Sequence, residues 1–236
     1  MCASGAAGHW DGIYRGRPDI WGIRAHALAE MLAARLAAGS MVLDLGCGTG
    51  VNCLHLGRAG IRSLGVDLSH EAVLLAQRRK ALEQDRFAEF IRADILGFLR
   101  TCPAGAFDGA LSVNVLNHLG ADIEEALRHV HRALRPGGCV ALSLFTERDE
   151  EWSGPAQATD SGGPPNQFPV RLLDRDDVQA ALLPFAVQLL LKEEYLDDPH
   201  PGASFRHRNS FWRILATRSQ RLLPGPAGSG ALSTGP

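Results

Sequence analysis

"MVLDLGCGTGVN" (residues 41–52) places a short apolar run directly before three glycines on alternate positions. Such a run predicts a strand buried on both faces of a parallel sheet, and the residues after the glycines predict a helix. The glycines predict a turn whose exposed backbone amides hold a ligand. A dinucleotide, a phosphate group and a sulfonium nucleoside are all candidate ligands at this point.

The overall composition narrows the class of protein. The 236 residues are enough for one large α/β domain, and the net charge of −2 gives no electrostatic reason to expect nucleic acid or a membrane as partner. Five cysteines without a C-x-x-C pair argue against a disulfide framework and a zinc ribbon, and we expect no metal. Without a membrane-spanning stretch or a secretory signal, the sequence predicts a cytoplasmic protein.

Strand-like and helix-like segments alternate along most of the chain, which predicts a doubly wound, mostly parallel α/β sheet. The predicted strands are 41–45, 62–69, 88–94, 107–115, 139–145, 185–196 and 204–218, and the first predicted helix covers about 22–38. We divide the chain into an N-terminal aromatic segment with this helix (1–40), a main domain (41–217) and a tail expected to be disordered (218–236). Residues 147–170, rich in glycine and proline, are expected to form a lid or substrate loop.

The glycine spacing separates the candidate ligands. Gly46, Gly48 and Gly50 give G-x-G-x-G, with Val51 where the dinucleotide fingerprint has its last glycine. In that fingerprint the last glycine allows close helix–strand packing beside a pyrophosphate, so its displacement argues against NAD. No Gly-Lys-Ser/Thr follows, which excludes a Walker loop.

Aspartates end three successive predicted strands beside this turn. Asp44 would repel a pyrophosphate but can accept from an ammonium group. Asp67 is placed for two ribose hydroxyls and Asp94 for an adenine amine. Together they predict a pocket for a cationic nucleoside without phosphate, such as S-adenosylmethionine. The simpler alternative is that Asp44 caps a helix and that Asp94 is the N-cap of the short helix after it.

Five segments resemble, in order and spacing, the successive motifs of class I S-adenosylmethionine-dependent methyltransferases: "VLDLGCGTG", "GVDLS", "RADIL", "FDGALSVNVLNHL" and "ALRPGGCVALSLF". The resemblance is strong over 38–146 and extends over most of 9–217. It implies a Rossmann-like seven-stranded sheet of order 3-2-1-4-5-7-6, with strand 7 antiparallel and helices on both faces. The chain is similar to small stand-alone enzymes of the tellurite-resistance and natural-product-tailoring types.

The resemblance also implies a cofactor site. The glycine turn would wrap the methionine part, Asp67 would bind the ribose, and the residues after the fourth strand would sit behind the sulfonium. Tyr14 belongs to an aromatic segment that resembles the caps of small-molecule methyltransferases, although it could simply pack on the surface. The predicted cofactor-binding residues are Tyr14, Asp44, Gly46, Cys47, Gly48, Gly50, Asn52, Asp67, Leu68, Asp94, Ile95, Asn114 and Val115.

Methyl transfer from a sulfonium depends mainly on alignment, and a base is needed only where the acceptor holds its proton tightly. His118, just after the fourth strand, is the first candidate for such a base, followed by His207 and His200 between the last two strands. The alternatives are that His118 orders its loop and that the other two are solvated loop residues.

We expect O-, N- or C-methylation of a small-molecule acceptor by a monomer or homodimer. The alternatives are methylation of a thiol or chalcogen, and a methyltransferase fold that binds S-adenosylmethionine without transferring methyl. Nucleic-acid methylation is disfavoured, because the fourth strand ends in "NVLN" rather than the Asp/Asn-Pro-Pro-Tyr/Phe of amino-methylating DNA enzymes.

Overall fold

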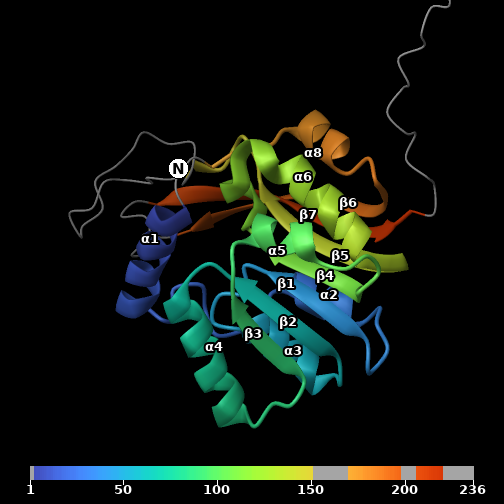
Figure 1. Ribbon diagram of the computed structural model, residues 1–236. Coiled ribbons are helices and arrows are strands. Elements are labelled where there is room, and N and C mark those ends of the chain that lie inside the picture. The colour runs from blue at the N-terminus through green and yellow to red at the C-terminus, as the bar shows by residue number, and fades with distance from the viewer. Residues whose placement is uncertain (1–2, 151–169, 198–205, 220–236) are drawn as a thin grey trace, which may run out of the picture.

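The computed structural model describes residues 3–150, 170–197 and 206–219. A seven-stranded sheet forms its centre, with helices on both faces (Figure 1). The strand order is β3-β2-β1-β4-β5-β7-β6; β1 to β5 are parallel, and β7 runs antiparallel to β5 and to β6. This order confirms the Rossmann-like fold that the resemblance implied.

The elements have the following bounds. The strands are β1 Met41–Leu45, β2 Arg62–Asp67, β3 Ala88–Arg92, β4 Phe107–Val113, β5 Leu134–Phe145, β6 Phe185–Asp197 and β7 His207–Arg218. The helices are α1 Ala3–Gly16, α2 Ala27–Ala33, α3 Val51–Arg58, α4 His70–Glu83, α5 Ile95–Thr101, the 3₁₀ helix η1 Leu116–Asp122, α6 Ile123–Ala133 and α8 Arg175–Ala181.

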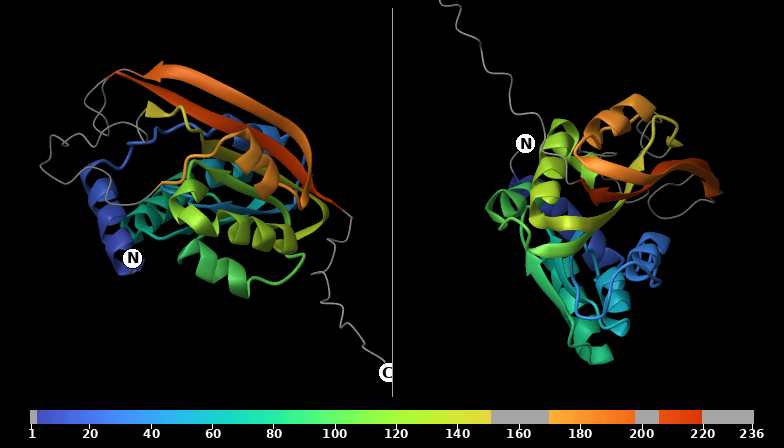
Figure 2. Two further views of the ribbon diagram at one scale, coloured as in Figure 1. Left: turned by 90° about the horizontal axis from the view of Figure 1, so that it is seen from above. Right: turned by 90° about the vertical axis from the view of Figure 1, so that its right-hand side faces the viewer.

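Buried apolar side chains attach the helices to the two faces of the sheet. On one face, Leu28 of α2 packs in a cluster with Val42 of β1 and Leu111 of β4. On the other face, Leu127 of α6 and Val178 of α8 belong to the largest cluster of the core. Figure 2 shows β6 and β7 running side by side along one edge of this layered structure.

The register of the parallel strands shows which residues lie at the ligand-binding edge of the sheet. Leu45 of β1 pairs with Val66 of β2, so the glycine turn after β1 and Asp67 at the end of β2 lie at the same edge. In open α/β sheets, ligands bind outside the carboxyl ends of the strands, where the strand order reverses. Here the reversal lies between β1 and β4, directly beside the glycine turn.

The N-terminal region differs from the sequence prediction. In place of one helix over about 22–38, the structure has α1 from Ala3 and a shorter α2 from Ala27. Helix α1 contains four glycines, including Gly8 and Gly12, and glycine is a poor helix former, so local propensity gave no signal. Tertiary contacts stabilise α1 in place of local propensity, as the buried Tyr14 side chain shows.

One later boundary was also wrong. The fifth strand was predicted to start at Cys139, whereas α6 ends at Ala133 and β5 begins at Leu134. The early start of β5 rests on a pairing of Leu134 with Phe107 that precedes a register shift. Pairing with β4 therefore makes β5 begin earlier in the chain than the sequence predicted.

The third glycine of the turn can be tested with a matched pair of substitutions. Gly50 has φ +79°, and an added Cβ would lie 2.6 Å from Phe90 Cζ and 2.9 Å from Ala76 Cβ. Gly105 has φ +66° and no atom within 4 Å of such a Cβ. We predict that Gly50→Ala lowers the free energy of unfolding by about 3 kcal/mol, through strain and overpacking. Gly105→Ala should cost only about 1–2 kcal/mol.

Urea denaturation of both variants measures the difference directly. Equal losses of stability in the two variants would show that the packing of Phe90 and Ala76 does not require a glycine at position 50.

Candidate functional site

The glycine turn is tied to the neighbouring strand by its own backbone. The amides of Gly46 and Cys47 both donate to the Val66 carbonyl of β2, at 2.8 and 3.1 Å. Gly46, Gly48 and Gly50 all have positive φ angles of 52° to 79°, which other residues rarely adopt. The glycines of this fixed turn carry no side chains that would prevent close approach of a ligand to the backbone.

Asp67 connects this turn with helix α4. Its Oδ2 accepts from the Gly48 amide at 2.8 Å, and its Oδ1 accepts from the Ser69 amide at 2.9 Å. The side chain is buried, and desolvation raises its pKa. Because a carboxylate has about four acceptor positions, these two bonds leave positions for further donors. Binding of ribose hydroxyls by Asp67 stays a prediction.

Asp44 is a second buried carboxylate beneath the turn. Only 1% of it is exposed, and its Oδ2 accepts from the Cys53 thiol at 3.3 Å. Burial raises the pKa of Asp44 to about 7, the Cys53 bond opposes this rise, and the nearby negative Asp67 adds to it. The alternative that Asp44 caps a helix is wrong, because Gly50 is the N-cap of α3 and no side chain caps that helix. A cationic ligand would favour the ionised carboxylate of Asp44.

Two predicted cofactor residues make structural contacts of their own. Asp94 is exposed and is the N-cap of α5, where its Oδ1 accepts from the Gly97 amide at 2.7 Å. The capping alternative is therefore confirmed, and contact with adenine stays a prediction for Asp94 and the buried Ile95. Asn52 accepts from the His26 amide at 2.9 Å, which ties α3 to the residues before α2. Leu68 lies half-buried beside Asp67.

A reciprocal pair of hydrogen bonds fixes Asn114 at the end of β4. The backbone amide of Asn114 donates to Ser143 Oγ at 2.9 Å, and Ser143 Oγ donates back to the side-chain Oδ1 of Asn114 at 2.5 Å. Asn114 has φ +55°, an uncommon value that is found often at functional sites. The next residue, Val115, packs closely on Gly46. A Cβ added to Gly46 would lie only 2.4 Å from a methyl group of Val115. Ser143 was missed by the sequence analysis, although a serine inside an apolar strand was a usable signal.

Helix α1 lies across the site. The Tyr14 hydroxyl is 2.9 Å from the position that a Cβ on Gly48 would take. Burial, followed by the negative charge of Asp67, raises the pKa of Tyr14, so its hydroxyl stays protonated. Further along α1, Trp10 meets His118 of η1 edge to face, with ring centroids 5.3 Å apart.

Polar contacts attach α1 to the start of α4. Asp11 Oδ1 accepts from Ser69 Oγ at 2.6 Å and from the Glu71 amide at 3.1 Å. Arg15 forms an ion pair with Glu71 at 2.7 Å. Helix α1 therefore reaches from the end of β2 to the residues after β4.

The candidate bases have different surroundings. Burial, followed by the nearby His9, lowers the pKa of His118 to about 4, so its imidazole is neutral at physiological pH and is a weaker base than an ordinary histidine. His207 is fully buried at the start of β7, 3.5 Å from Asn209, so the alternative that it is a solvated loop residue is wrong. His200 lies outside the described residues.

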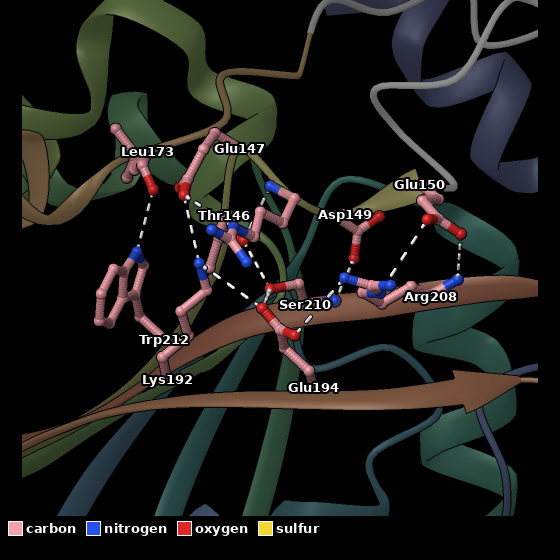
Figure 3. A network of polar contacts seen from close by, with 11 residues as sticks. Thr146, Glu147, Asp149, Glu150, Leu173, Lys192, Glu194, Arg208, Ser210 and Trp212 are labelled. Atoms are coloured by element: carbon pink, nitrogen blue, oxygen red, sulfur yellow. Dashed lines mark hydrogen bonds and ion pairs between the residues drawn. The ribbon is translucent and has the colours of Figure 1, made fainter.

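A polar network joins the end of β5 to β6 and β7 near the same edge (Figure 3). Thr146 donates to Ser210 Oγ at 2.6 Å, and the Ser210 amide donates to the buried Asp149 at 2.8 Å. Lys192 of β6 pairs with Glu147 at 3.2 Å. These contacts fix the start of the predicted lid or substrate loop, whose residues 151–169 lie outside the described ranges.

Known proteins share this domain. Residues 43–142 match the family model of a methyltransferase domain. An S-adenosyl-L-methionine-dependent Diels-Alderase of Talaromyces variabilis is 37% identical over 109 residues, 45% of this chain and 37% of that protein. A ubiquinone biosynthesis O-methyltransferase of Pseudomonas aeruginosa is 32% identical over 145 residues, 61% of this chain and 60% of that protein. The chain spans about half the length of the curated relatives it matches.

A solved structure has the same fold. It is the 1,6-didemethyltoxoflavin-N1-methyltransferase of Burkholderia thailandensis with bound 1,6-didemethyltoxoflavin and S-adenosylhomocysteine. The TM-score is 0.65 at 23% identity, over 92% of this chain and 88% of that one. Residues 43–142 are thus similar in sequence to methyltransferase domains, and the chain shares the fold of this solved methyltransferase.

The described residues contain neither a membrane-spanning helix nor a metal-binding cluster. Within the described ranges, no helix is long and apolar enough to cross a membrane. Among the same residues, no group of three or more His, Cys, Asp or Glu side chains is arranged to hold a metal ion.

The buried carboxylate of Asp44 predicts a pH dependence of cofactor binding. Below a pKa of about 7 the free protein holds a proton on Asp44, and a bound cation favours its release. We predict that the affinity for S-adenosylmethionine rises about tenfold between about pH 5.5 and about pH 7.5. Titration calorimetry in two buffers of different ionisation enthalpy measures both the affinity and the released proton.

Asp44→Asn is the control, and it should remove both the pH dependence and the proton release. The Asp44→Asn substitution should also change how the stability of the protein depends on pH. An acid whose folded pKa is raised from about 4 to about 7 destabilises the fold as pH rises through that range. Asp44→Asn should therefore raise Tm more at about pH 8 than at about pH 5. Proton-free binding by the native protein at about pH 5.5 would contradict this account of Asp44.

Proposed function

We propose that the protein transfers the methyl group of S-adenosylmethionine to an oxygen, nitrogen or carbon atom of a small molecule. The observation that carries this proposal is the position of α1 over the glycine turn, with Tyr14 against Gly48 and Trp10 against His118. An acceptor must reach the cofactor beneath or beside this helix. That restriction favours a small acceptor over a nucleic acid or a folded protein.

The residues present fit the cofactor. Asp44 and Asp67 place two buried carboxylates beside the turn, which suits a ligand with a cationic sulfonium and an ammonium group. The left-handed glycines of the turn carry no side chains that would keep a ligand from its backbone. The bound cofactor supplies an activated methyl group.

The chain's contribution to the reaction is mainly alignment, which is worth about 7–11 kcal/mol in favourable systems. Helix α1 and the end of β4 would enclose the reacting atoms and limit the access of water. Where the acceptor must lose a proton, we propose that neutral His118 takes it at Nδ1 or Nε2, although its lowered pKa makes it a weaker base than an ordinary histidine. His118 would then be a catalytic residue.

A second candidate function is binding of S-adenosylmethionine without methyl transfer. The specific observation in its favour is the similarity to a protein named as an S-adenosyl-L-methionine-dependent Diels-Alderase. In such a role, α1 would enclose a substrate that rearranges within the pocket. Methylation of a thiol or chalcogen is a third possibility on the same site, with His118 unnecessary for a thiolate acceptor.

Labelled cofactor separates these functions. The protein is incubated with S-adenosylmethionine carrying an isotope in its methyl group and with fractions of a metabolite extract. The proposal predicts label in a small product together with S-adenosylhomocysteine. Tight cofactor binding without label transfer to any fraction would favour the second candidate.

The role of His118 has its own matched test. We predict that His118→Ala leaves cofactor affinity within about twofold but lowers turnover of a phenol or hydroxyl acceptor about 100-fold, since general-base catalysis contributes about 10²–10⁴-fold. His129→Ala, on α6, is the control and should keep full turnover. Turnover by His118→Ala equal to that of the native protein would remove His118 from the mechanism.

A further inference from the structure

Strand β6 is the edge of the sheet, and it carries apolar side chains that the described residues leave exposed. Four of the ten exposed large hydrophobic residues lie on it: Val187, Leu191, Tyr195 and Leu196. β6 is long, and its pairing with β7 is regular from Leu189 to Asp197, beyond the irregularity at Val187. A long, regular and partly apolar edge is a template for pairing with another strand.

We propose that β6 pairs antiparallel with β6 of a second copy across a two-fold axis at Glu193, so that the two sheets become continuous in a homodimer. In a dimer of this symmetry the same strand supplies both sides of the interface. Opposing side chains of antiparallel strands share one face of the sheet. The pairing must therefore join positions of the same parity along β6.

The register centred on Glu193 matches the exposed side chains of β6. It places Leu191 opposite Tyr195 on one face, twice by symmetry. On the other face it places Lys192 opposite Glu194 and Leu190 opposite Leu196. The exposed fractions of Leu191, Tyr195 and Leu196 are 47%, 52% and 59%, so this register covers the apolar side chains that water now contacts.

Like charges disfavour the two registers nearest to the proposed one. A shift that centres the strands on Lys192 opposes two lysines, and a shift to Glu194 opposes two glutamates, and like charges directly opposite destabilise a sheet. The register centred on Glu193 also opposes two like charges, at the axis itself. Each Glu193 already has a compensating cation, since Arg213 of β7 lies 2.6 Å away. Of these three registers, the one centred on Glu193 is the one in which Lys192 and Glu194 of the two copies meet with opposite charges.

A second copy of this chain is the occupant that the pattern fits. The sequence of β6 is complementary to itself in charge and in apolar pairs, which an unrelated strand has no reason to match. The inference does not depend on the proposed function, because β6 lies at the opposite edge of the sheet from β3 and the pairing uses no cofactor contact.

Sedimentation of the full chain tests the oligomeric state. We expect a dimer at about 50 µM, with Leu191→Asp raising the dissociation constant at least about tenfold, because it sets two charges against Tyr195. Leu82→Asp, at an exposed leucine of α4, is the matched control and should leave the dimer intact. S-adenosylmethionine affinity equal to that of the native protein shows that each variant is folded.

Cysteine cross-linking tests the register. In a background in which Cys2 and Cys139 are serine, oxidation of Glu193→Cys should give a covalent dimer, since position 193 faces itself across the axis. Leu191→Cys should not, because the two copies of position 191 lie about four residues, or roughly 13 Å, apart along the strands. A native protein that is monomeric at about 50 µM, or cross-linking of Leu191→Cys but not Glu193→Cys, would overturn the proposal.

Discussion

The carboxylate of Asp67 is the constraint on which the arrangement of the site depends. It accepts one hydrogen bond from a backbone amide of the glycine turn after β1 and another from a backbone amide at the start of α4. Both donors lie beside it because β1 and β2 are parallel neighbours whose last residues are in register. Burial desolvates the carboxylate and raises its pKa, whereas these two hydrogen bonds stabilise its ionised form and lower the pKa. A cationic ligand would further favour the ionised form.

Ser69 links Asp67 to helices α4 and α1. Ser69, whose amide binds Asp67, caps α4 with its hydroxyl and also donates to Asp11 of α1. Helix α1 is poor in intrinsic helix propensity and is held by such contacts, which places Tyr14 against Gly48. A cofactor bound beside Tyr14 would therefore act on α1 as well as on the turn.

The sequence could predict the strands and the acids at their ends, because buried parallel strands and alternate glycines leave a local pattern. Asp44 and Asp67 were found in this way, and the strand order followed from the family resemblance. Helix α1 could not be predicted, because its stability comes from Asp11, Tyr14 and Arg15 meeting distant residues. The burial of His207 was missed for the same reason, since a polar residue after a turn carries no local sign of burial. The bonds of Asn114 to Ser143 likewise join strands that are 29 residues apart in sequence.

Calorimetric titration of S-adenosylmethionine into Asp67→Asn is the most direct test of the account. An asparagine there would turn an amide donor toward the Gly48 or Ser69 amide and would remove the negative charge. We predict that the native protein binds S-adenosylmethionine but not NAD, and that Asp67→Asn binds it at least about tenfold more weakly. Asp174→Asn, at the N-cap of α8, is the control and should bind like the native protein. Unchanged affinity in Asp67→Asn, or tight binding of NAD by the native protein, would contradict the assignment of this turn to a sulfonium nucleoside.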